Sequence, residues 1–199
     1  MGPNDIELVA LAKVAQNDTA FAELVRRHQA RLRAFLRRLC GSEFLADDIA
    51  QDTFIKAHAA IASFEGGGSF RSWLYAIAYR EFLQTRRKEK AATRLKDALK
   101  DDVVHANAAE TKIEMGLSLD LRRALATLED LERAALLLCD AAGLSHSEAA
   151  IAIDAPLGSV KTYVARARQK MRAALSADAA TSNADCSATP APNGACHAL

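Results

Sequence analysis

Apolar residues recur at helical spacing along most of the chain, and runs of β-branched residues are absent. The pattern predicts three early helices over residues 5–15, 17–40 and 45–62, and two later ones over 117–128 and 131–142. Alanine, leucine and arginine dominate while glycine and proline are sparse, and this composition also favours helices. The predicted fold class is therefore all-α.

Two further helices around a short turn are predicted between residues 144 and 172. Ser145 can cap the first helix, with Glu148 as its capping-box partner three residues later. Pro156 then separates the two helices, because proline disfavours a helical residue before it and can open a new helix itself. The result is a candidate helix-turn-helix.

The second of these two helices, Leu157 to Arg172, has one basic face and one apolar face. Its cations are Lys161, Arg166, Arg168, Lys170 and Arg172, and its apolar residues include Val160, Val164, Ala167 and Met171. No acidic residue lies among them, although the net charge of the whole chain is only +1. Such a helix can pack by one face and lie in the major groove of DNA by the other. A solvated basic helix on any globular protein shows the same pattern.

Two segments carry weaker patterns. Residues 89–116 have many charges and little apolar periodicity, which indicates a linker with one partial helix at most. From Ser176 the chain is small, polar and contains proline, so we expect disorder there. The predicted boundaries are 5–88 and 118–175 for two small helical domains, 89–117 for a flexible linker, and 176–199 for a disordered tail.

The sequence gives little indication of a membrane-spanning segment or a metal site. No stretch of about 18 apolar residues exists, and the first residues do not resemble a secretory signal, so we expect a cytoplasmic protein. Cys40 and Cys139 lie in apolar helical patterns, which predicts buried thiols. Cys186, Cys196 and His197 lie in the tail, where their spacing matches no zinc template and leaves a metal or redox role open. We expect no cofactor and no metal site.

The third predicted helix carries a polar cluster. Asp47, Asp48, Gln51 and Asp52 follow one another at a spacing that places them on one exposed face. Acidic residues in a first turn complement the helix dipole, which explains Asp47 and Asp48. The same argument explains Gln51 and Asp52, one turn later, less well.

A glycine-rich loop between two phenylalanines, Phe64 and Phe70, precedes the most aromatic part of the chain. It is not a phosphate-binding loop, because no lysine follows at the required spacing and no strand precedes it. The segment 71–80 interleaves aromatic rings with cations, as single-stranded nucleic acid requires. Trp73 also suits the core, and the sequence leaves the roles of Tyr75, Tyr79 and Arg80 open.

Taken in order, these stretches resemble a bacterial sigma factor of the sigma-70 family, group 4, the extracytoplasmic-function (ECF) type. Residues 46–57, from Ala46 to Ala57, are similar to the family's region 2.2. Residues 63–64 and 69–78 are similar to region 2.3, and residues 158–162 with 166–168 to the recognition helix of region 4.2. The resemblance covers roughly residues 5–88 and 118–175.

The resemblance implies a transcription initiation factor rather than an enzyme, with promoter DNA and core RNA polymerase (β′ clamp helices and β flap) as partners and no small-molecule substrate. It implies polymerase binding by Asp47, Asp48, Gln51 and Asp52. It implies −10 DNA binding by Phe64, Gly66, Gly67, Ser69, Trp73, Tyr75, Tyr79 and Arg80, with one base flipped beside the loop. It implies −35 DNA binding by Ser159, Lys161, Thr162, Ala165, Arg166 and Arg168. An anti-sigma factor, which can sequester such a protein at the membrane, is a further implied partner.

Three positions depart from the family pattern. Arg80 stands where the family usually has asparagine, Glu129 where it often has proline, and Tyr163 where it often has arginine. Arg80 and Tyr163 leave open a sigma-like decoy that binds an anti-sigma factor without initiating transcription. A second alternative is a helix-turn-helix DNA-binding repressor with an N-terminal dimerisation domain.

Overall fold

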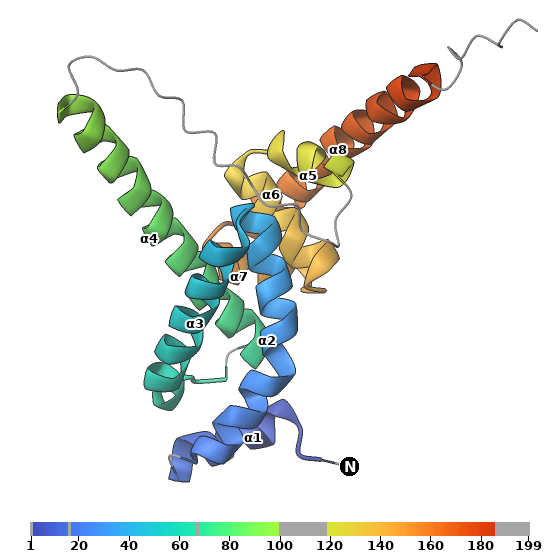
Figure 1. Cartoon of the computed structure of the whole chain (residues 1–199). Coiled ribbons are helices and arrows are strands. Elements are labelled where there is room, and N and C mark those ends of the chain that lie inside the picture. Colours follow the sequence, from blue (N-terminus) through green and yellow to red (C-terminus); the bar gives the residue numbers. More distant parts are fainter. Residues whose placement is uncertain (1, 16, 67, 100–118, 186–199) are drawn as a thin grey trace, which may run out of the picture.

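The computed structural model of the protein describes residues 2–15, 17–66, 68–99 and 119–185, which form helices and short connections (Figure 1). No strand occurs within these ranges, which confirms the predicted all-α class. None of the helices in them is long and apolar enough to cross a membrane.

The N-terminal half contains α1 (Asp5–Ala15), α2 (Asp18–Cys40), α3 (Glu43–Ala60), a short 3-10 turn η1 (Ile61–Ser63) and α4 (Phe70–Leu99). The Asn17 side chain caps α2 by accepting from the backbone N–H groups of Thr19 and Ala20. Gly41 ends α2 in the left-handed conformation with φ of 72°, which a residue without Cβ adopts without strain. Ser42 caps α3, so this helix begins two residues before the predicted start at Leu45.

The core of this half lies where α2 packs against α3 and α4. Leu24, Leu32, Phe35, Leu36 and Leu39 lie along the inner face of α2 and are at most 1% exposed. Burying a side chain of this size stabilises the fold by roughly 1.5–3 kcal/mol, so this face of α2 contributes substantially to the stability of the half.

The C-terminal half contains α5 (Leu119–Ala126), α6 (Asp130–Leu136), a π-helical turn η2 (Leu137–Ala141), α7 (His146–Ile153) and α8 (Leu157–Asp185). Its core collects leucines of α6 and η2 around the apolar face of α8, where Val160, Val164 and Ala167 are at most 1% exposed. The predicted apolar face of the second helix of the motif is therefore confirmed.

Two helices extend further than predicted. The linker was expected from residue 89, but α4 continues to Leu99. The tail was expected to be disordered from Ser176, but α8 continues to Asp185. The extension of α4 is rich in alanine, leucine, lysine and other good helix formers, which need no apolar periodicity to stay helical. The extension of α8 combines alanines with serine, threonine, asparagine and aspartate, which are weaker helix formers. Residues 100–118 and the tail residues Cys186, Cys196 and His197 lie outside the described part.

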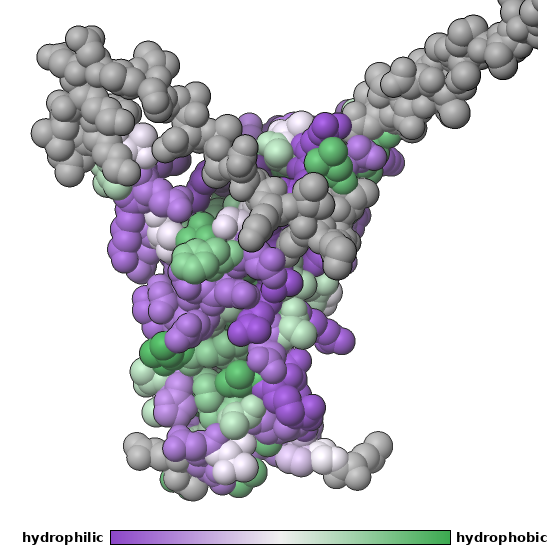
Figure 2. All heavy atoms as spheres, viewed as in Figure 1, coloured by the Kyte–Doolittle hydropathy of each residue, from purple (hydrophilic) through white to green (hydrophobic). Residues whose placement is uncertain are grey.

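The two halves pack against each other, with α7 lying along α4 and η2 near α2. Figure 1 shows the far ends of α4 and α8 projecting away from this junction. The surface seen in Figure 2 is largely hydrophilic, with small hydrophobic areas over α2 and α3.

Candidate nucleic-acid interface

The helix-turn-helix forms as predicted. Ser145 Oγ accepts from the Glu148 backbone N–H at 3.2 Å, and a Glu148 carboxylate oxygen accepts from the Ser145 backbone N–H at 2.9 Å. Asp154 ends α7 in the left-handed conformation with φ of 52°, and α8 starts after Pro156. On α8, Lys161, Thr162 and Ala165 are all exposed, opposite the buried face of the helix. These are the residues predicted to meet the base edges of the −35 element.

The remaining cations of α8 are less available than the sequence indicates. Arg168 makes two hydrogen bonds to Asp140, at 2.6 and 3.1 Å. Lys170 Nζ donates to the buried carboxylate of Glu132 at 2.6 Å. Both acids lie on other helices, so the sequence of α8 by itself contains no acidic partner for these cations. A phosphate bound by Arg168 must displace Asp140, whereas the part of the chain that the structure describes offers no such partner for Lys161 or Arg166.

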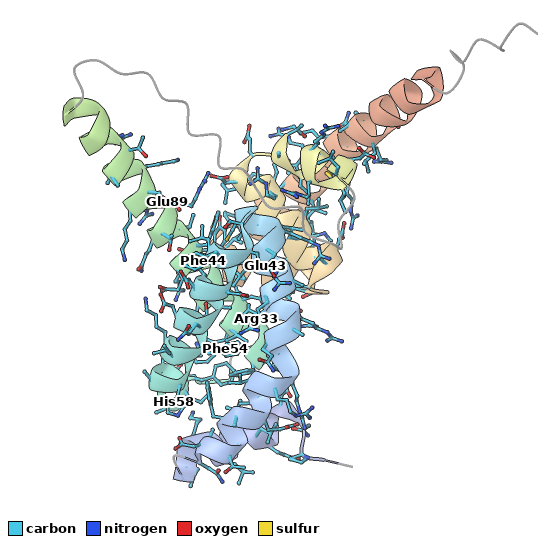
Figure 3. The ribbon with its side chains drawn as sticks, viewed as in Figure 1. Arg33, Glu43, Phe44, Phe54, His58 and Glu89 are labelled. Carbon is cyan, nitrogen blue, oxygen red and sulfur yellow. The ribbon has the colours of Figure 1, made fainter. Side chains whose placement is uncertain are left out.

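The polar cluster on α3 divides into two. Asp48, Gln51 and Asp52 are exposed, whereas Asp47 is half-buried and faces α2, with a carboxylate oxygen 3.6 Å from Arg33 Nε. Figure 3 shows Arg33 on α2 directed toward α3. At about 100° per residue the four positions spread over an arc of about 140°, and Asp47 lies at the edge of this arc that meets α2. The expectation of four residues on one exposed face is wrong for Asp47.

Two large apolar side chains on α3 were not singled out from the sequence. Phe44 is 78% exposed and Ile55 is 60% exposed. Figure 3 shows Phe44 near the start of the helix. Exposed apolar groups beside a polar cluster are typical of a protein-binding surface. Helical spacing places neither residue on the face of α3 that packs against α2 and α4, and this could have been read from the sequence.

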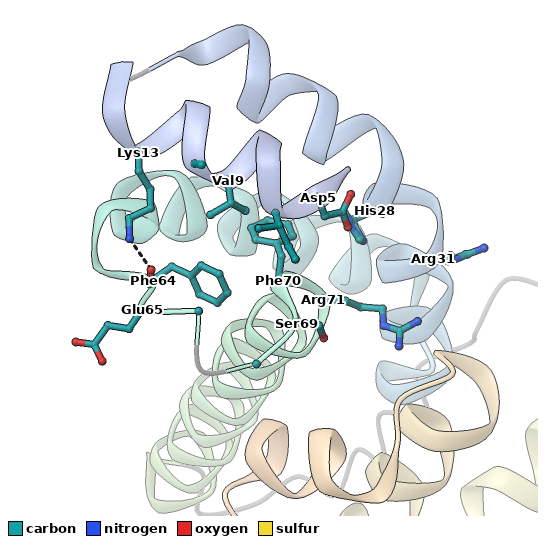
Figure 4. A pocket seen from close by; sticks show the side chains of 14 residues that line it. Asp5, Val9, Lys13, His28, Arg31, Phe64, Glu65, Ser69, Phe70 and Arg71 are labelled. Atoms are coloured by element: carbon teal, nitrogen blue, oxygen red, sulfur yellow. Dashed lines mark hydrogen bonds and ion pairs between the residues drawn. The ribbon is translucent and has the colours of Figure 1, made fainter. Parts of the chain in front are cut away.

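The glycine-rich loop is held at both ends, as predicted. Phe64, Phe70 and Trp73 form a cluster of aromatic rings whose centroids lie 5.1–6.3 Å apart. Gly66 has φ of 77°, a conformation that glycine adopts readily, and Gly67 lies outside the described residues. A third anchor was not predicted: Lys13 Nζ on α1 donates to the Phe64 carbonyl oxygen at 2.6 Å (Figure 4).

A cavity lies on each side of this loop. The larger, about 690 Å³, lies between α1, α2 and the loop, and its lining includes Phe64, His28 and Arg71 (Figure 4). The smaller, about 330 Å³, lies between the loop and α4, where Trp73 and Arg80 contribute to its wall. Ile151 of α7 also lines the smaller cavity, although it belongs to the other half of the protein.

The two tyrosines among the predicted −10 residues are buried. Tyr75 is 1% exposed and packs edge-on against Phe35 with ring centroids 5.0 Å apart, and burial raises its pKa to about 12. Tyr79 is 3% exposed and stacks with Phe82. Burial, and then Asp130 and Tyr163, raise the pKa of Tyr79 to about 12. Neither ring is available for stacking on bases in this arrangement, so the prediction for Tyr75 and Tyr79 is corrected, because both rings fill apolar space. Trp73 is half-buried, in line with its expected core role.

Comparison with known proteins assigns both halves of the chain to one family. The family models for Sigma-70 region 2 and Sigma-70, region 4 match residues 24–92 and 118–171. Sigma factor NccH of Alcaligenes xylosoxydans xylosoxydans is 34% identical over 83% of this chain and 93% of its own length. ECF sigma factor SigE of Mycolicibacterium smegmatis is also 34% identical over 75% of this chain, and the match spans 59% of SigE.

A solved structure is similar over most of the chain. The sigma factor RpoE in complex with the anti-sigma factor NepR from Bartonella quintana superposes with a TM-score of 0.66, at 30% identity, over 79% of this chain and 98% of RpoE. Fold, motif and relatives together define a two-part transcription initiation factor. The chain belongs to the sigma-70 family, and within it to the ECF sigma factors.

Proposed function

We propose that this sigma factor binds core RNA polymerase and directs it to promoters by opening the −10 element and reading the −35 element. The observation that carries this proposal is one chain with two DNA-facing parts. They are the aromatic loop at the start of α4 and the exposed face of α8 with Lys161, Thr162 and Ala165. A repressor with a helix-turn-helix needs only the second part.

At the −10 element, the smaller cavity beside the loop is the proposed site for a flipped base. Its wall offers the Phe64 and Trp73 rings for apolar contact and the Arg80 side chain for hydrogen bonds. Unstacking a base costs a few kcal/mol, which these contacts must offset. The family's usual asparagine both donates and accepts hydrogen bonds, whereas arginine only donates. The flipped base should therefore present acceptors to Arg80, and the −10 preference should differ from that of asparagine-containing relatives.

At the −35 element, α8 is proposed to lie in the major groove. Lys161 suits the O6 and N7 acceptors of guanine, while the Thr162 methyl group and Ala165 suit a thymine methyl. Arg166 and Ser159 are proposed to hold phosphates and so to set the register of the helix. Substitution of Lys161, Thr162 or Ala165 should change which −35 sequence is chosen, and substitution of Arg166 should weaken all sequences alike.

Core polymerase is proposed to bind the outer face of α3. Asp48, Gln51 and Asp52 supply its polar part, and Phe44 and Ile55 supply exposed apolar area. Asp47 is proposed to act differently from the other three, by holding α3 against α2 through Arg33. An anti-sigma factor is proposed as a further partner, because the similar RpoE is bound by one. Cytoplasmic location, with sequestration at a membrane through that partner, remains a prediction.

A pull-down with core polymerase followed by run-off transcription tests the proposal. Asp48→Lys with Asp52→Lys should abolish polymerase binding, and the circular dichroism spectrum should stay unchanged because both side chains are exposed. Glu89→Lys, a charge reversal at an exposed position of α4 (Figure 3), is the matched control and should bind normally. Polymerase binding without transcripts indicates a decoy. DNA binding without polymerase binding indicates a repressor.

A further inference from the structure

An ion pair with one buried partner joins α3 to α4 beside the smaller cavity. Lys56 Nζ donates to Glu81 Oε2 at 2.5 Å. Glu81 is 8% exposed, whereas 49% of the Lys56 side chain is accessible. Among the described residues of these two helices, this is the one side-chain hydrogen bond that joins them. A buried carboxylate is strongly unfavourable without its cation, so the pair favours the one setting of α4 in which Lys56 reaches Glu81.

The packing of α3 against α4 gives little resistance to rotation of α4 about its own axis. The buried residues of α3 are mostly small, namely Ala46, Ile49, Ala50, Thr53 and Ala57. Small side chains form shallow ridges, which interlock weakly with the grooves of a facing helix. The Thr53 hydroxyl donates to the Ile49 carbonyl oxygen of its own helix at 2.6 Å, so it makes no link to α4. The Lys56–Glu81 pair is thus the directional contact between the two helices.

Arg80 directly precedes Glu81 on α4. It is exposed and lines the smaller cavity together with Trp73 and Ala76, which lie seven and four residues earlier on the same side of the helix. In the part of the chain that the structure describes, no hydrogen bond or ion pair holds the Arg80 guanidinium itself. Neighbouring residues of a helix point about 100° apart, so fixing Glu81 also fixes the direction from which Arg80 enters the cavity.

We propose that Lys56 and Glu81 are positioning residues for recognition of the −10 element. The pair sets the rotation of α4, and this directs Arg80 toward the acceptors of the flipped base, although neither Lys56 nor Glu81 lines the cavity. This role rests on the proposed base site. An apolar pair would hold α3 against α4 equally well, since hydrophobic residues often replace a buried ion pair without loss of stability. An ion pair has a defined direction, which an apolar contact lacks.

The full chain, assembled with core polymerase, allows a test by selection from a pool of single-stranded DNA with a randomised segment. Sequencing of the bound fraction gives the selectivity at each position, as the ratio of the most to the least enriched base. Arg80→Ala identifies the position that Arg80 reads. Glu81→Met removes the carboxylate and keeps a side chain of similar size, and the released Lys56 can turn into solvent.

In Glu81→Met, selectivity should fall about fivefold or more at the position that Arg80 reads and stay unchanged at the others. Urea unfolding should show no loss of stability. Glu81→Gln, whose amide oxygen still accepts from Lys56, should retain most of the selectivity. Glu132→Gln is the matched control, because Glu132 forms a similar pair with Lys170 in the other half, and it should leave the selectivity unchanged.

Selectivity that survives in Glu81→Met, at a position where Arg80→Ala loses it, overturns the positioning role and leaves the proposed function intact. A loss spread evenly over all positions also overturns it, since such a loss reports a general role in folding. If Arg80→Ala changes no position, the proposed base contact of Arg80 fails and the positioning role fails with it. Should Glu81→Met not fold, Lys56→Met gives the same test from α3, because the unpaired carboxylate then turns toward water.

Discussion

At the scale of single residues, the Lys13 side chain connects α1 to the glycine-rich loop. It lies on α1, before the segment that the region 2 family model matches, yet its amine holds the carbonyl oxygen of Phe64. Asp5 on the same helix binds Arg27 and His28 of α2, at 3.1 and 2.7 Å, and so keeps α1 in place. The first helix therefore stabilises the position of the proposed −10 loop.

Lys13→Met should loosen this loop without unfolding the protein. The hydrogen bond is partly exposed, so its loss should cost about 1 kcal/mol or less in global stability. Amide hydrogen exchange at Glu65 and Gly66 should accelerate, and −10 oligonucleotide binding should weaken. Lys13→Arg, which keeps a donor, is the control. Unchanged exchange at these amides would show that Lys13 does not anchor the loop.

The two half-buried thiols of the described chain, Cys40 and Cys139, should react slowly with alkylating reagents. Burial raises the pKa of Cys40 to about 12 and also raises that of Cys139. Only the thiolate reacts, and at pH 8 almost none is present at such a pKa. Peptide mass spectrometry after iodoacetamide treatment should show far slower labelling of both residues in native protein than in urea. Equal rates in the two conditions would contradict the predicted burial.

At the scale of elements, the contact between α6 and α8 depends on a buried carboxylate. Glu132 is 2% exposed, completes the capping box of α6 with Glu129 and accepts from Lys170 at 2.6 Å. Its partner is much more exposed, since 42% of the Lys170 side chain is accessible. Removing Lys170 and removing the Glu132 carboxylate should therefore lower the free energy of unfolding by different amounts.

Lys170→Met should destabilise the C-terminal half more than Glu132→Gln does. Removing the lysine leaves a buried carboxylate without its cation, which should cost about 1–3 kcal/mol. Glutamine keeps the cap and removes the buried charge, so its cost should stay below about 1 kcal/mol. Urea unfolding of both variants measures the difference, and the double variant should be close to Glu132→Gln alone. The opposite order would show that the charge of Glu132 itself stabilises the fold.

At the scale of the whole molecule, the contact between the halves joins the two proposed DNA sites into one closed arrangement. It places Glu148 beside the Ser69 and Arg71 donors at the start of α4, and it places Ile151 in the lining of the smaller cavity. The charged group that acts on Glu148 across this junction is Arg71, and the neutral donors are Ser69, just before α4, and Ser145, just before α7.

The closed arrangement should therefore respond to acid. Contact with α4 lowers the pKa of Glu148, so the stabilisation is fully present above the usual glutamate pKa and is lost as pH falls through the lowered value. The distance between nitroxide labels at the exposed positions Arg87→Cys on α4 and Gln169→Cys on α8, measured by pulsed electron resonance, should stay constant from pH 8 to about pH 5 and lengthen in stronger acid. In Glu148→Gln the acid transition should be absent. Glu23, whose pKa the hydrogen bonds from Arg26 and Arg27 lower to about 2, should remain ionised over most of this range.

Local sequence signals determined the elements and their order. Ser145 and Glu148 cap α7 as predicted, because a cap needs only residues within three positions of each other. The all-α class and the exposed face of Lys161, Thr162 and Ala165 follow from helical periodicity alone. The order of the region 2 and region 4 motifs also pointed to the ECF sigma factors, which the relatives confirm.

Only the tertiary structure decided which of these residues are available. Arg168 is held by Asp140, 28 residues away in the sequence, and Asp47 is turned toward α2. Tyr75 and Tyr79 are core residues, although their pattern also fits a stacking surface. Glu148 caps its own helix, as predicted, and also binds Ser69, 79 residues earlier. Capping and periodicity act within a few residues, whereas burial and ion pairing depend on which distant helices come to lie side by side.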